Sequence, residues 1–508
     1  MTGTGIPLRV HDHNELFESE EYQRQFARKR EFEAPCDPAE VARVAEWTKG
    51  WEYREKNLAR QALSVNPAKA CQPLGAVLAA AGFAGTLPLV HGSQGCVAYF
   101  RSHLTRHFME PTAAVSSSMT EDAAVFGGLN NLVEALDNAS ALYKPDMIAV
   151  STTCMAEVIG DDLQNFIATA RQKGSVAKDF PVPFAHTPSF VGSHLTGYDA
   201  MLRGILSHLN EGRAGVANGR LNVVPGFATN VGDLREIKRI LDLMGVRHTV
   251  LGDHSDTFDS PATGDHVLYP GGTPLAVAAD AINATATLFL QEAASRKTAD
   301  LVRTEWKRPE STVEFPLGVG NTDRFVMEVA RLAGVGVPDA LTVERGRLVD
   351  AMADSHAYLH GKRVAVAGDP DQVVALLGFL LELGMRPVHV VATNGDEAFA
   401  NRARAVLDAS PFGAGATVWP GRDLWHLRSL VFTEPVDLLI GSSPLKYLAR
   451  EAEVPLARFG FPICERPHLH RFGQIGYTGG VQLLAQLVNT VLDELDRSAS
   501  SRNFDLVR

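Results

Sequence analysis

Cysteine is scarce in this chain, and no cysteine has a neighbour at the spacing of a familiar small metal site. The five cysteines stand at positions 36, 71, 96, 154 and 464. None forms a C-x-x-C pair, which excludes the usual zinc-ribbon and thioredoxin-like arrangements. Any cysteines that bind metal must therefore come from segments far apart in the sequence.

Long apolar runs and an excess of basic residues are also missing. The apolar stretches near 76–90 and 373–385 are interrupted by Gly, Pro or Glu, and they fall short of the ~20 residues that a membrane-spanning helix needs. The start of the chain lacks the basic and apolar pattern of a secretory signal. A net charge of −11 disfavours nucleic acid and anionic membranes as partners. We expect a cytoplasmic protein without structural disulfides, binding neither nucleic acid nor a membrane.

Nucleotide-binding loops are absent from the sequence as well. No G-x-x-x-x-G-K-[ST] segment occurs, and Gly318–Asp323 lacks the third glycine of a dinucleotide fingerprint. If nucleotide energy drives this system, another protein must bind the nucleotide.

The pattern that is present, from about residue 61 onward, is strand, loop and helix repeated many times. This alternation predicts α/β domains with mostly parallel sheets. The 508 residues exceed what one hydrophobic core usually supports, so two to four domains are expected. In such folds ligands bind beyond the carboxyl ends of the strands.

Two internal repeats refine the domain prediction. The segment 221–251 and the segment 363–391 each read as strand, helix and strand, and so form two copies of one βαβ unit. A second similarity links 145–151 to 435–442. We therefore predict three related Rossmann-like domains at 61–215, 216–345 and 346–508, the last including a C-terminal tail.

The first 60 residues read as a helical extension. Residues 15–33 mix acids and bases, and Asp37, Pro38 and Glu40 have the pattern of an N-cap, a first-turn proline and a capping-box acid. Trp47 and Trp51, four residues apart, are expected to share one face of a helix. We expect this extension to contact a partner rather than carry chemistry.

Three cysteines stand where segments meet. Cys71 precedes a helix that has Pro73 in its first turn, Cys96 follows an apolar strand through the glycine-containing turn 91–95, and Cys154 follows the predicted strand 147–151. A helix N-terminus favours a thiolate. A buried cysteine is by default an inert apolar side chain, so both interpretations stay open at this point.

Thiolates without accompanying histidines suit iron–sulfur ligation better than zinc. A self-contained cluster usually takes four cysteines, so three indicate a cluster at an interface that a second chain completes. Ser189, in the loop after the predicted strand 182–187, is an ordinary loop serine on this reasoning alone.

A few other residues could carry function. Asp350 and Asp354 are one helical turn apart and could ligate a hard cation, and Glu110 is a lone candidate of the same kind, although solvated surface is the default for all three. Ser118 and Glu121 fit a capping box that starts a helix ending near Phe126. Phe126 is either a core residue or an exposed docking aromatic.

With these pieces assembled, the chain closely resembles the β subunits of nitrogenase component 1, the molybdenum–iron protein. The resemblance covers essentially the whole length, and five motifs carry it: 67–75, 91–100, 116–128, 151–162 and 423–432.

The resemblance implies an enzyme, as a subunit that does not bind substrate. It implies an α2β2 tetramer in which each αβ pair shares a P-cluster of eight irons and seven sulfurs. It implies Cys71 and Cys154 as terminal ligands, Cys96 as a bridging ligand, and Ser189 as an oxygen ligand engaged on oxidation.

The remaining candidates also gain roles from the resemblance. Glu110, with Asp350 and Asp354 of the other β subunit, would form an intersubunit iron or calcium site. Phe126 would dock the ATP-hydrolysing iron protein, while Tyr99 and Phe100 would flank the electron path to the FeMo-cofactor. That cofactor lies in the α subunit alone, where N2 is reduced to ammonia with H2 evolution.

Three other classes remain as alternatives. A homologous cofactor-assembly scaffold subunit generally keeps fewer of these cysteines. A dark-operative protochlorophyllide reductase subunit is shorter and lacks such an extension. A non-catalytic α/β interaction protein with buried cysteines would contain no iron.

Overall fold

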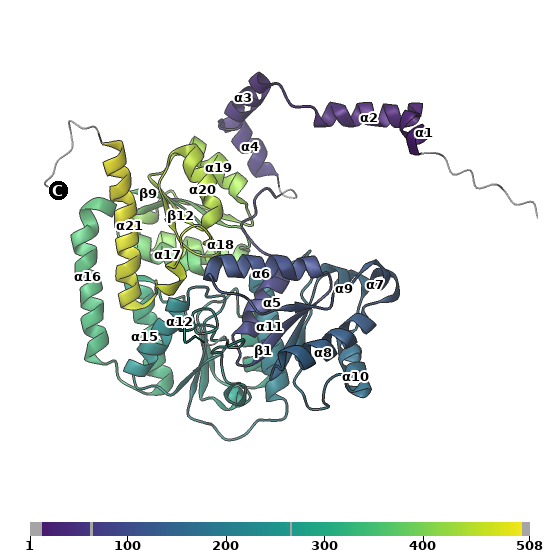
Figure 1. Ribbon diagram of the computed structural model, residues 1–508. Helices are drawn as coiled ribbons and strands as arrows, with labels where there is room; N and C mark the ends of the chain where they lie inside the picture. The colour runs from purple at the N-terminus through teal and green to yellow at the C-terminus, as the bar shows by residue number, and fades with distance from the viewer. Residues whose placement is uncertain (1–12, 61–63, 265–266, 500–508) are drawn as a thin grey trace, which may run out of the picture.

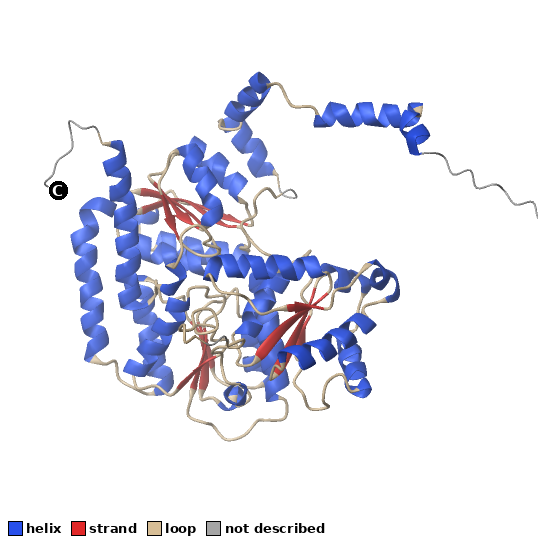
Figure 2. Ribbon diagram, viewed as in Figure 1, coloured by secondary structure: helices blue, strands red, loops and turns tan. Residues whose placement is uncertain are grey.

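A computed structural model of the chain describes residues 13–60, 64–264 and 267–499. The described part contains three β-sheets in which every strand pair is parallel, surrounded by helices (Figure 1, Figure 2). The predicted α/β class with a helical N-terminal region is therefore confirmed. The boundaries near 215 and 345 stay predictions. The start of the predicted extension (1–12), the first residues of the predicted first domain (61–63) and the end of the predicted tail (500–508) lie outside the described residues.

The first sheet has the strand order β2-β1-β3-β4. Its strands are β1 (Thr86–His91), β2 (Val115–Ser116), β3 (Met147–Thr152) and β4 (Phe184–Ala185). Its helices are α5 (Gln72–Ala81), α6 (Gln94–Phe108), α7 (Glu121–Phe126), α8 (Leu129–Tyr143), α9 (Cys154–Ile159), α10 (Leu163–Lys173) and α11 (His194–Asn210).

The second sheet has the order β6-β5-β7-β8. Its strands are β5 (Leu221–Val224), β6 (His248–Val250), β7 (Ala286–Phe289) and β8 (Glu310–Thr312). The accompanying helices are α12 (Val231–Leu243), α13 (Leu275–Ala278), η1 (Ala281–Asn283), α14 (Arg296–Asp300), η2 (Leu301–Glu305) and α15 (Gly318–Ala333).

The third sheet has the order β11-β10-β9-β12-β13. Its strands are β9 (Arg363–Ala367), β10 (Arg386–Ala392), β11 (Thr417–Pro420), β12 (Leu438–Gly441) and β13 (Leu456–Arg458). Its helices are α16 (Asp339–Leu359), α17 (Pro370–Glu382), η3 (Pro411–Gly413), α18 (Glu397–Asp408), α19 (Leu424–Thr433), η4 (Ser443–Leu445), α20 (Lys446–Ala452), η5 (Leu469–Arg471) and α21 (Gly476–Ser498).

The repeated βαβ unit predicted from the sequence is present in both places. Strand β5 pairs in parallel with β6 after α12, and β9 pairs in parallel with β10 after α17. A parallel pair needs a crossover, and in each copy the helix supplies it.

The central strands are largely apolar because both faces of each sheet are covered. All six residues of β1 and all six of β3 are buried. On one face of the first sheet, Leu87 and Ile148 pack with helices α8 and α10. On the other face, Val90 and Ala149 pack with α5 and α11.

Hydrophobic packing continues between the sheets. One cluster joins the first sheet to Val224 and Phe289 of the second, and another joins Val223 of the second sheet to Val366 of the third. The three sheets are therefore held against one another by shared apolar contacts, which positions the loops at their strand ends in a common region.

The N-terminal helices form an arm. Helices α1 (His13–Glu18), α2 (Glu20–Glu33) and α3 (Pro38–Trp47) extend away from the three sheets (Figure 1). Helix α4 (Trp51–Ala59) attaches the arm to α19, where Asn57 donates to the carbonyl of Trp425 and to the hydroxyl of Ser429. No residue of α2 or α3 is buried. An amphipathic arm left uncovered in this way suits contact with another chain.

Two details of local structure differ from expectation. Trp47 ends α3 and Trp51 begins α4, so they lie on two helices, because the turn 48–50 interrupts the helical period. Helix α7 begins after Thr120, and Ser118 does not cap it, because Ser118 adopts a left-handed conformation with φ 51°.

Within the described ranges, none of the helices combines the length and apolar character that crossing a bilayer requires.

Candidate metal centre

Each of the three predicted cysteines stands at the start of a helix. Cys71 is the N-cap residue of α5, Cys96 is in the first turn of α6, and Cys154 is the first residue of α9. The unpaired backbone N–H groups of a helix start favour negative charge. The backbone therefore presents three positions that favour thiolates.

The turns that carry Cys96 and Cys154 lie side by side. Strands β1 and β3 pair along their whole length, with His91 opposite Thr152 at their carboxyl ends. Gly92 continues β1 with φ 147°, and a Cβ atom there would lie 1.9 Å from Oγ1 of Thr153. No side chain fits at residue 92, and this close approach is what brings the two turns together.

Helices α5 and α11 bring the third cysteine to the same region. A Cβ on Gly75 would lie 1.7 Å from the carbonyl oxygen of His194, and one on Gly197 would lie 1.9 Å from that of Gln72. The two helices therefore touch through their backbones. The contact fixes the N-terminus of α5, where Cys71 stands, against the start of α11.

Gln72 holds the loop that carries Ser189. Its Nε2 donates to the carbonyl of Pro188 at 3.0 Å and to that of Val191 at 2.9 Å. The hydroxyl of Ser189 lies close enough to the Cys71 thiol to lower the pKa of that thiol. The structure thus places Ser189 directly beside Cys71, so the serine singled out by the resemblance belongs to the same constellation.

The thiols influence one another electrostatically. Burial raises the pKa of Cys71, while the Ser189 hydroxyl opposes this rise and the charge of Cys154 adds to it. Burial also raises the pKa of Cys96, and the charges of Cys154 and Cys71 raise it further. Ionising these neighbouring thiols together therefore requires a compensating positive charge, and a metal centre would supply one.

The donors present at the site suit an iron–sulfur cluster. Among the described residues, no three His, Cys, Asp or Glu side chains are grouped closely enough to hold one metal ion. A cluster spreads its ligands over different irons, so its thiolates need not meet around one point. Soft thiolates with one hydroxyl are a donor set suited to iron and sulfur.

The site is open on one side. Cys71 and Cys96 are half-buried and Cys154 is exposed. Phe190 and Val191 of the Ser189 loop are large apolar side chains that are also exposed. Apolar surface beside free thiols is the arrangement expected where another chain covers a shared site.

The two aromatic residues after Cys96 lie along α6 in different environments. Phe100 is buried, whereas Tyr99 is half-exposed, and their ring centroids are 5.8 Å apart. Burial raises the pKa of Tyr99, and the charges of Cys71 and Cys464 raise it further. Tyr99 therefore lies within electrostatic range of Cys71 and of Cys464, a cysteine without an assigned role.

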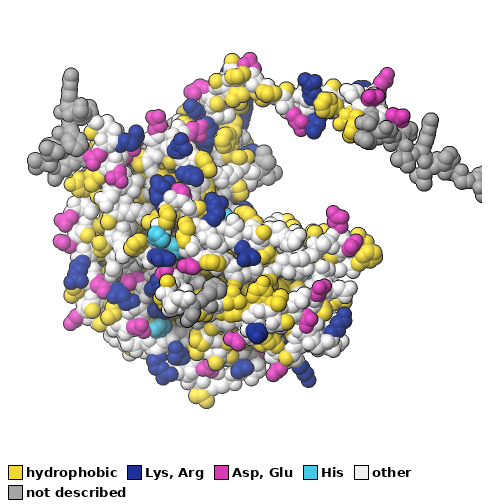
Figure 3. Space-filling model, viewed as in Figure 1, with side chains coloured by type: hydrophobic (Ala, Val, Ile, Leu, Met, Phe, Trp, Pro, Cys, Tyr) yellow, Lys and Arg dark blue, Asp and Glu magenta, His cyan; other side chains and the backbone are white. Residues whose placement is uncertain are grey.

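Phe126 is at the C-terminal end of α7 and is 86% exposed. Val125 and Val158 are also exposed, at 76% and 77%. Below them Ala123 of α7 packs on Ala156 of α9. We refer to Val125, Phe126 and Val158 as the apolar knob. Figure 3 shows hydrophobic side chains at the tip that α7 forms, beside acidic ones.

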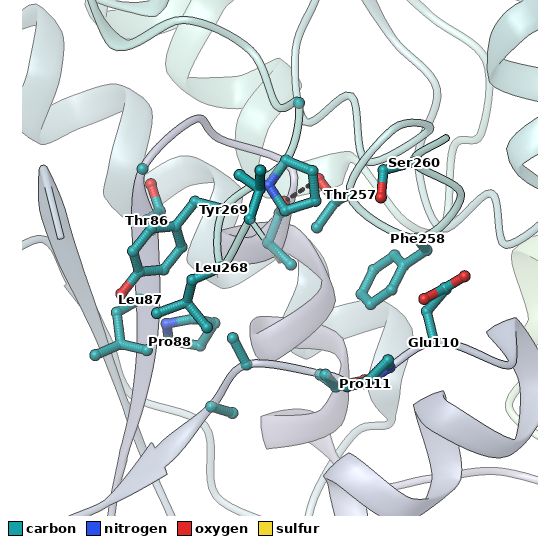
Figure 4. A pocket seen from close by; sticks show the side chains of 18 of the residues that line it. Thr86, Leu87, Pro88, Glu110, Pro111, Thr257, Phe258, Ser260, Leu268 and Tyr269 are labelled. Atoms are coloured by element: carbon teal, nitrogen blue, oxygen red, sulfur yellow. Dashed lines mark hydrogen bonds between the residues drawn. The ribbon is translucent and has the colours of Figure 1, made fainter. Parts of the chain in front are cut away.

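The carboxylates predicted to bind a hard cation are dispersed in this chain. Glu110 follows α6 and lies 3.9 Å from the guanidinium of Arg471. It lines a cavity of about 500 Å³, with Phe258 near it and Tyr269 toward the other end (Figure 4). Asp350 and Asp354 are exposed on α16. Within the described residues these three acids form no three-ligand group.

The sequence reasoning overlooked several residues that shape the site. Gln72 is one, and its place directly after Cys71 was the available signal. His194 is another: its Nδ1 contacts the backbone of Ala70 and its Nε2 lies 3.1 Å from both carboxylate oxygens of Asp369. Asp369 is on the third sheet unit, so no local sequence pattern could have indicated this contact.

Comparison with known proteins identifies the family. Residues 71–492 match the family described as nitrogenase component 1 type oxidoreductase, and residues 7–57 match a domain of unknown function. A nitrogenase molybdenum-iron protein beta chain from Frankia alni is 63% identical, covering 99% of this chain and 97% of that relative.

Two further comparisons agree. A beta chain of the same description from Nostoc sp. is 56% identical, covering 99% of both chains. A solved structure, "Nitrogenase Cp1 at pH 6.5", has a TM-score of 0.86 and 41% identity, covering 88% of this chain and 98% of that one. The chain therefore belongs to the nitrogenase component 1 type oxidoreductases, in the group of the molybdenum-iron protein beta chains.

Proposed function

We propose that this chain holds half of a P-cluster through Cys71, Cys96 and Cys154, with Ser189 as an oxygen ligand on oxidation. The observation that carries the proposal is the proximity of three thiols, each at the start of a helix, to one another and to the Ser189 hydroxyl in its loop. When bound, the cluster supplies reversible storage of electrons. A serine oxygen is a harder ligand than a thiolate and favours oxidised iron, which suits a ligand that engages on oxidation.

The chain's own groups would perform three tasks at this site. The helix N-termini of α5 and α9 would stabilise the negative charge of the thiolates. Gln72 would hold Ser189 within reach while leaving its hydroxyl free to exchange its partner. The buried strands β1 and β3 would fix the separation of Cys96 and Cys154.

The proposal includes an α subunit that supplies the remaining ligands, giving an α2β2 tetramer. Support comes from the exposure of Cys154 and Phe190 and from the uncovered helices of the N-terminal arm. The FeMo-cofactor would lie in the α subunit alone. N2 reduction to ammonia, with H2 evolution, would occur there and not in this chain.

The proposed role in turnover is electron relay. The ATP-hydrolysing iron protein would dock on the apolar knob, because Phe126 is almost fully exposed although it is large and apolar. Tyr99 and Phe100 would flank the electron path toward the FeMo-cofactor. The protein would act in the cytoplasm.

Two further parts of the proposal concern assembly. Glu110, together with Asp350 and Asp354 of a second β subunit, would bind an intersubunit iron or calcium ion. The predicted domains at 61–215, 216–345 and 346–508 would be three related units behind the extension 1–60.

The decisive experiment is to co-express this chain with its α subunit and to measure iron and acid-labile sulfide in the purified complex. We expect both in the wild type, and a marked loss of both in Cys96→Ala. Cys464→Ala is the matched control, since Cys464 is also half-buried and near Tyr99. Full iron content and unchanged redox spectra in Cys96→Ala would refute the assignment.

A further inference from the structure

A buried set of hydrogen bonds begins just behind the apolar knob. The carboxylate of Asp161 accepts from the backbone N–H of Gly128 at 3.1 Å through Oδ1. Its Oδ2 lies 2.9 Å from Nε2 of His91. Gly128 is two residues beyond Phe126, so the exposed end of α7 is fastened to a buried carboxylate and imidazole.

The same set continues to the turn that carries Cys96. Nδ1 of His91 lies 2.9 Å from the hydroxyl of Ser117, and that hydroxyl accepts from the backbone N–H of Gly92 at 3.0 Å. Gly92 opens the turn between β1 and α6. One continuous chain of polar contacts therefore links the residue behind the knob to the residue that starts the cysteine turn.

When His91 is neutral, every polar group in this series of hydrogen bonds has a partner. Burial lowers the pKa of His91, although Asp161 opposes the effect. A neutral imidazole has one N–H, which it donates to Asp161, while its Nδ1 accepts from the Ser117 hydroxyl. The Ser117 oxygen is then available to Gly92, so every group in the chain has a partner.

Gly128, in the middle of this series of hydrogen bonds, is tightly packed. A Cβ on Gly128 would lie 2.6 Å from Oδ2 of Asp161 and 2.7 Å from Nε2 of His91. Both side chains are almost completely buried. The backbone at Gly128 therefore cannot move inward without displacing the Asp161–His91 pair.

His91 also reaches the second cysteine turn. Its carbonyl accepts from the backbone N–H of Thr153 at 2.9 Å, and Thr153 directly precedes Cys154. Asp161 follows the short helix α9 that Cys154 begins. The pair thus contacts the segments before Cys96 and on both sides of Cys154.

We propose that Asp161 and His91 are positioning residues that couple occupancy of the apolar knob to the geometry of the Cys96 and Cys154 turns. The inference rests on the proposed function, since it takes the iron protein as the occupant of the knob. Binding of the iron protein at Phe126 moves Gly128, which displaces the Asp161–His91 pair. The displaced pair then shifts the backbone at Gly92 and Thr153.

The test measures amide hydrogen exchange in the assembled αβ protein, with and without the iron protein. In wild type, we expect iron protein binding to change exchange in both segments 117–128 and 91–99. Asp161→Asn keeps the size of the side chain and removes the charge-assisted bond. Without the iron protein, the Asp161→Asn protein should exchange its amide hydrogens at Gly92 and Gly128 about tenfold faster than wild type does. With the iron protein bound, the response should remain in 117–128 and be lost in 91–99.

The matched control is Asp162→Asn. It removes the same charge one residue away, on an exposed side chain, and asparagine can still cap α10 as Asp162 does for the N–H of Asn165. This variant should respond as wild type does. If Asp161→Asn does not assemble, Ser117→Ala cuts the same chain at its other end and should give the same uncoupled response.

Two results would overturn the coupling while leaving the proposed function intact. One is an Asp161→Asn protein whose 91–99 segment responds to the iron protein as strongly as wild type does. The other is a wild type that binds the iron protein at saturation with no change in 91–99. A wild-type complex without iron, or one that does not bind the iron protein, contradicts the proposed function itself.

Discussion

The backbone N–H of Thr153 donates to the carbonyl of His91 across 2.9 Å, and this single bond ties the residue before Cys154 to the strand that leads to Cys96. It extends the pairing of β1 with β3 by one step beyond the ladder. The two cysteine turns therefore share one backbone framework, and a change in the backbone conformation of one turn should alter that of the other.

The close approach at Gly92 gives a first prediction. Gly92→Ala forces a Cβ against Thr153 in a backbone conformation that L residues rarely adopt, and we expect it to lower the free energy of unfolding by about 2 to 4 kcal/mol. Chemical denaturation measures this. Gly174→Ala is the control, because Gly174 also has positive φ but has open space around it. Its loss of unfolding free energy should therefore come from backbone strain alone. Equal losses in the two variants would show that the Thr153 contact carries no energy.

The loop that carries Ser189 gives a second prediction. Gln72→Leu leaves the carbonyls of Pro188 and Val191 without their shared donor, and we expect local stability of the loop to fall by about 1 to 3 kcal/mol. Faster amide exchange in 188–193 would report it. Gln94→Leu changes an exposed glutamine near Cys96 and should leave this loop unchanged. If amides 188–193 exchanged as slowly in Gln72→Leu as in wild type, the Gln72 hydrogen bonds would not be what holds this loop.

A third prediction concerns Phe126 and the proposed docking of the iron protein. Removing an exposed aromatic anchor typically weakens binding strongly, so Phe126→Ala should raise the Kd for the iron protein by about 10- to 100-fold. Folding stability should change by less than ~0.5 kcal/mol, because Phe126 makes few contacts of its own. Leu142→Ala removes another exposed apolar side chain, on α8, and should bind as wild type does. Unaltered affinity in Phe126→Ala would move the docking surface elsewhere.

The buried carboxyl of Asp233 gives a prediction about pH. Burial raises its pKa from an ordinary 3.8 to about 7, although the backbone N–H groups of Gln474 and Ile475 oppose the rise. The protonated form is thus favoured in the folded state. The protonated Asp233 carboxyl contributes its full share to the free energy of unfolding below pH ~4. This contribution is lost as pH rises through about 7, and it amounts to roughly 4 kcal/mol at most.

Asp233→Asn should remove this dependence, since asparagine is neutral at every pH. The difference in unfolding free energy between variant and wild type should therefore grow in favour of the variant from pH ~4 to pH ~7. Asp242→Asn, on the exposed side of the same region, is the control and should follow the wild-type curve. A constant difference across this range would show that Asp233 does not titrate there.

Much of the fold was predictable because it depends on local patterns. The apolar runs at 86–90 and 147–151 are long enough, and bounded clearly enough, to indicate buried strands, which the structure has at Thr86–His91 and Met147–Thr152. The helices that follow have recognisable starts. Cys71 at an N-cap position with Pro73 behind it could be read directly from the residues. Local reading failed where backbone conformation overruled it, as at Ser118 and in the turn between Trp47 and Trp51.

The sequence by itself determined the parallel α/β class, the helix starts that carry Cys71, Cys96 and Cys154, and the family, because each depends on residues that are close together or on motifs compared one by one. The tertiary structure alone decided which of these positions meet. Gly75 touching His194, Gln72 clamping 188–191 and Asp161 joining His91 to Gly128 all unite residues far apart in the chain. Such contacts arise from packing helices on a shared sheet, and no spacing in the sequence encodes them.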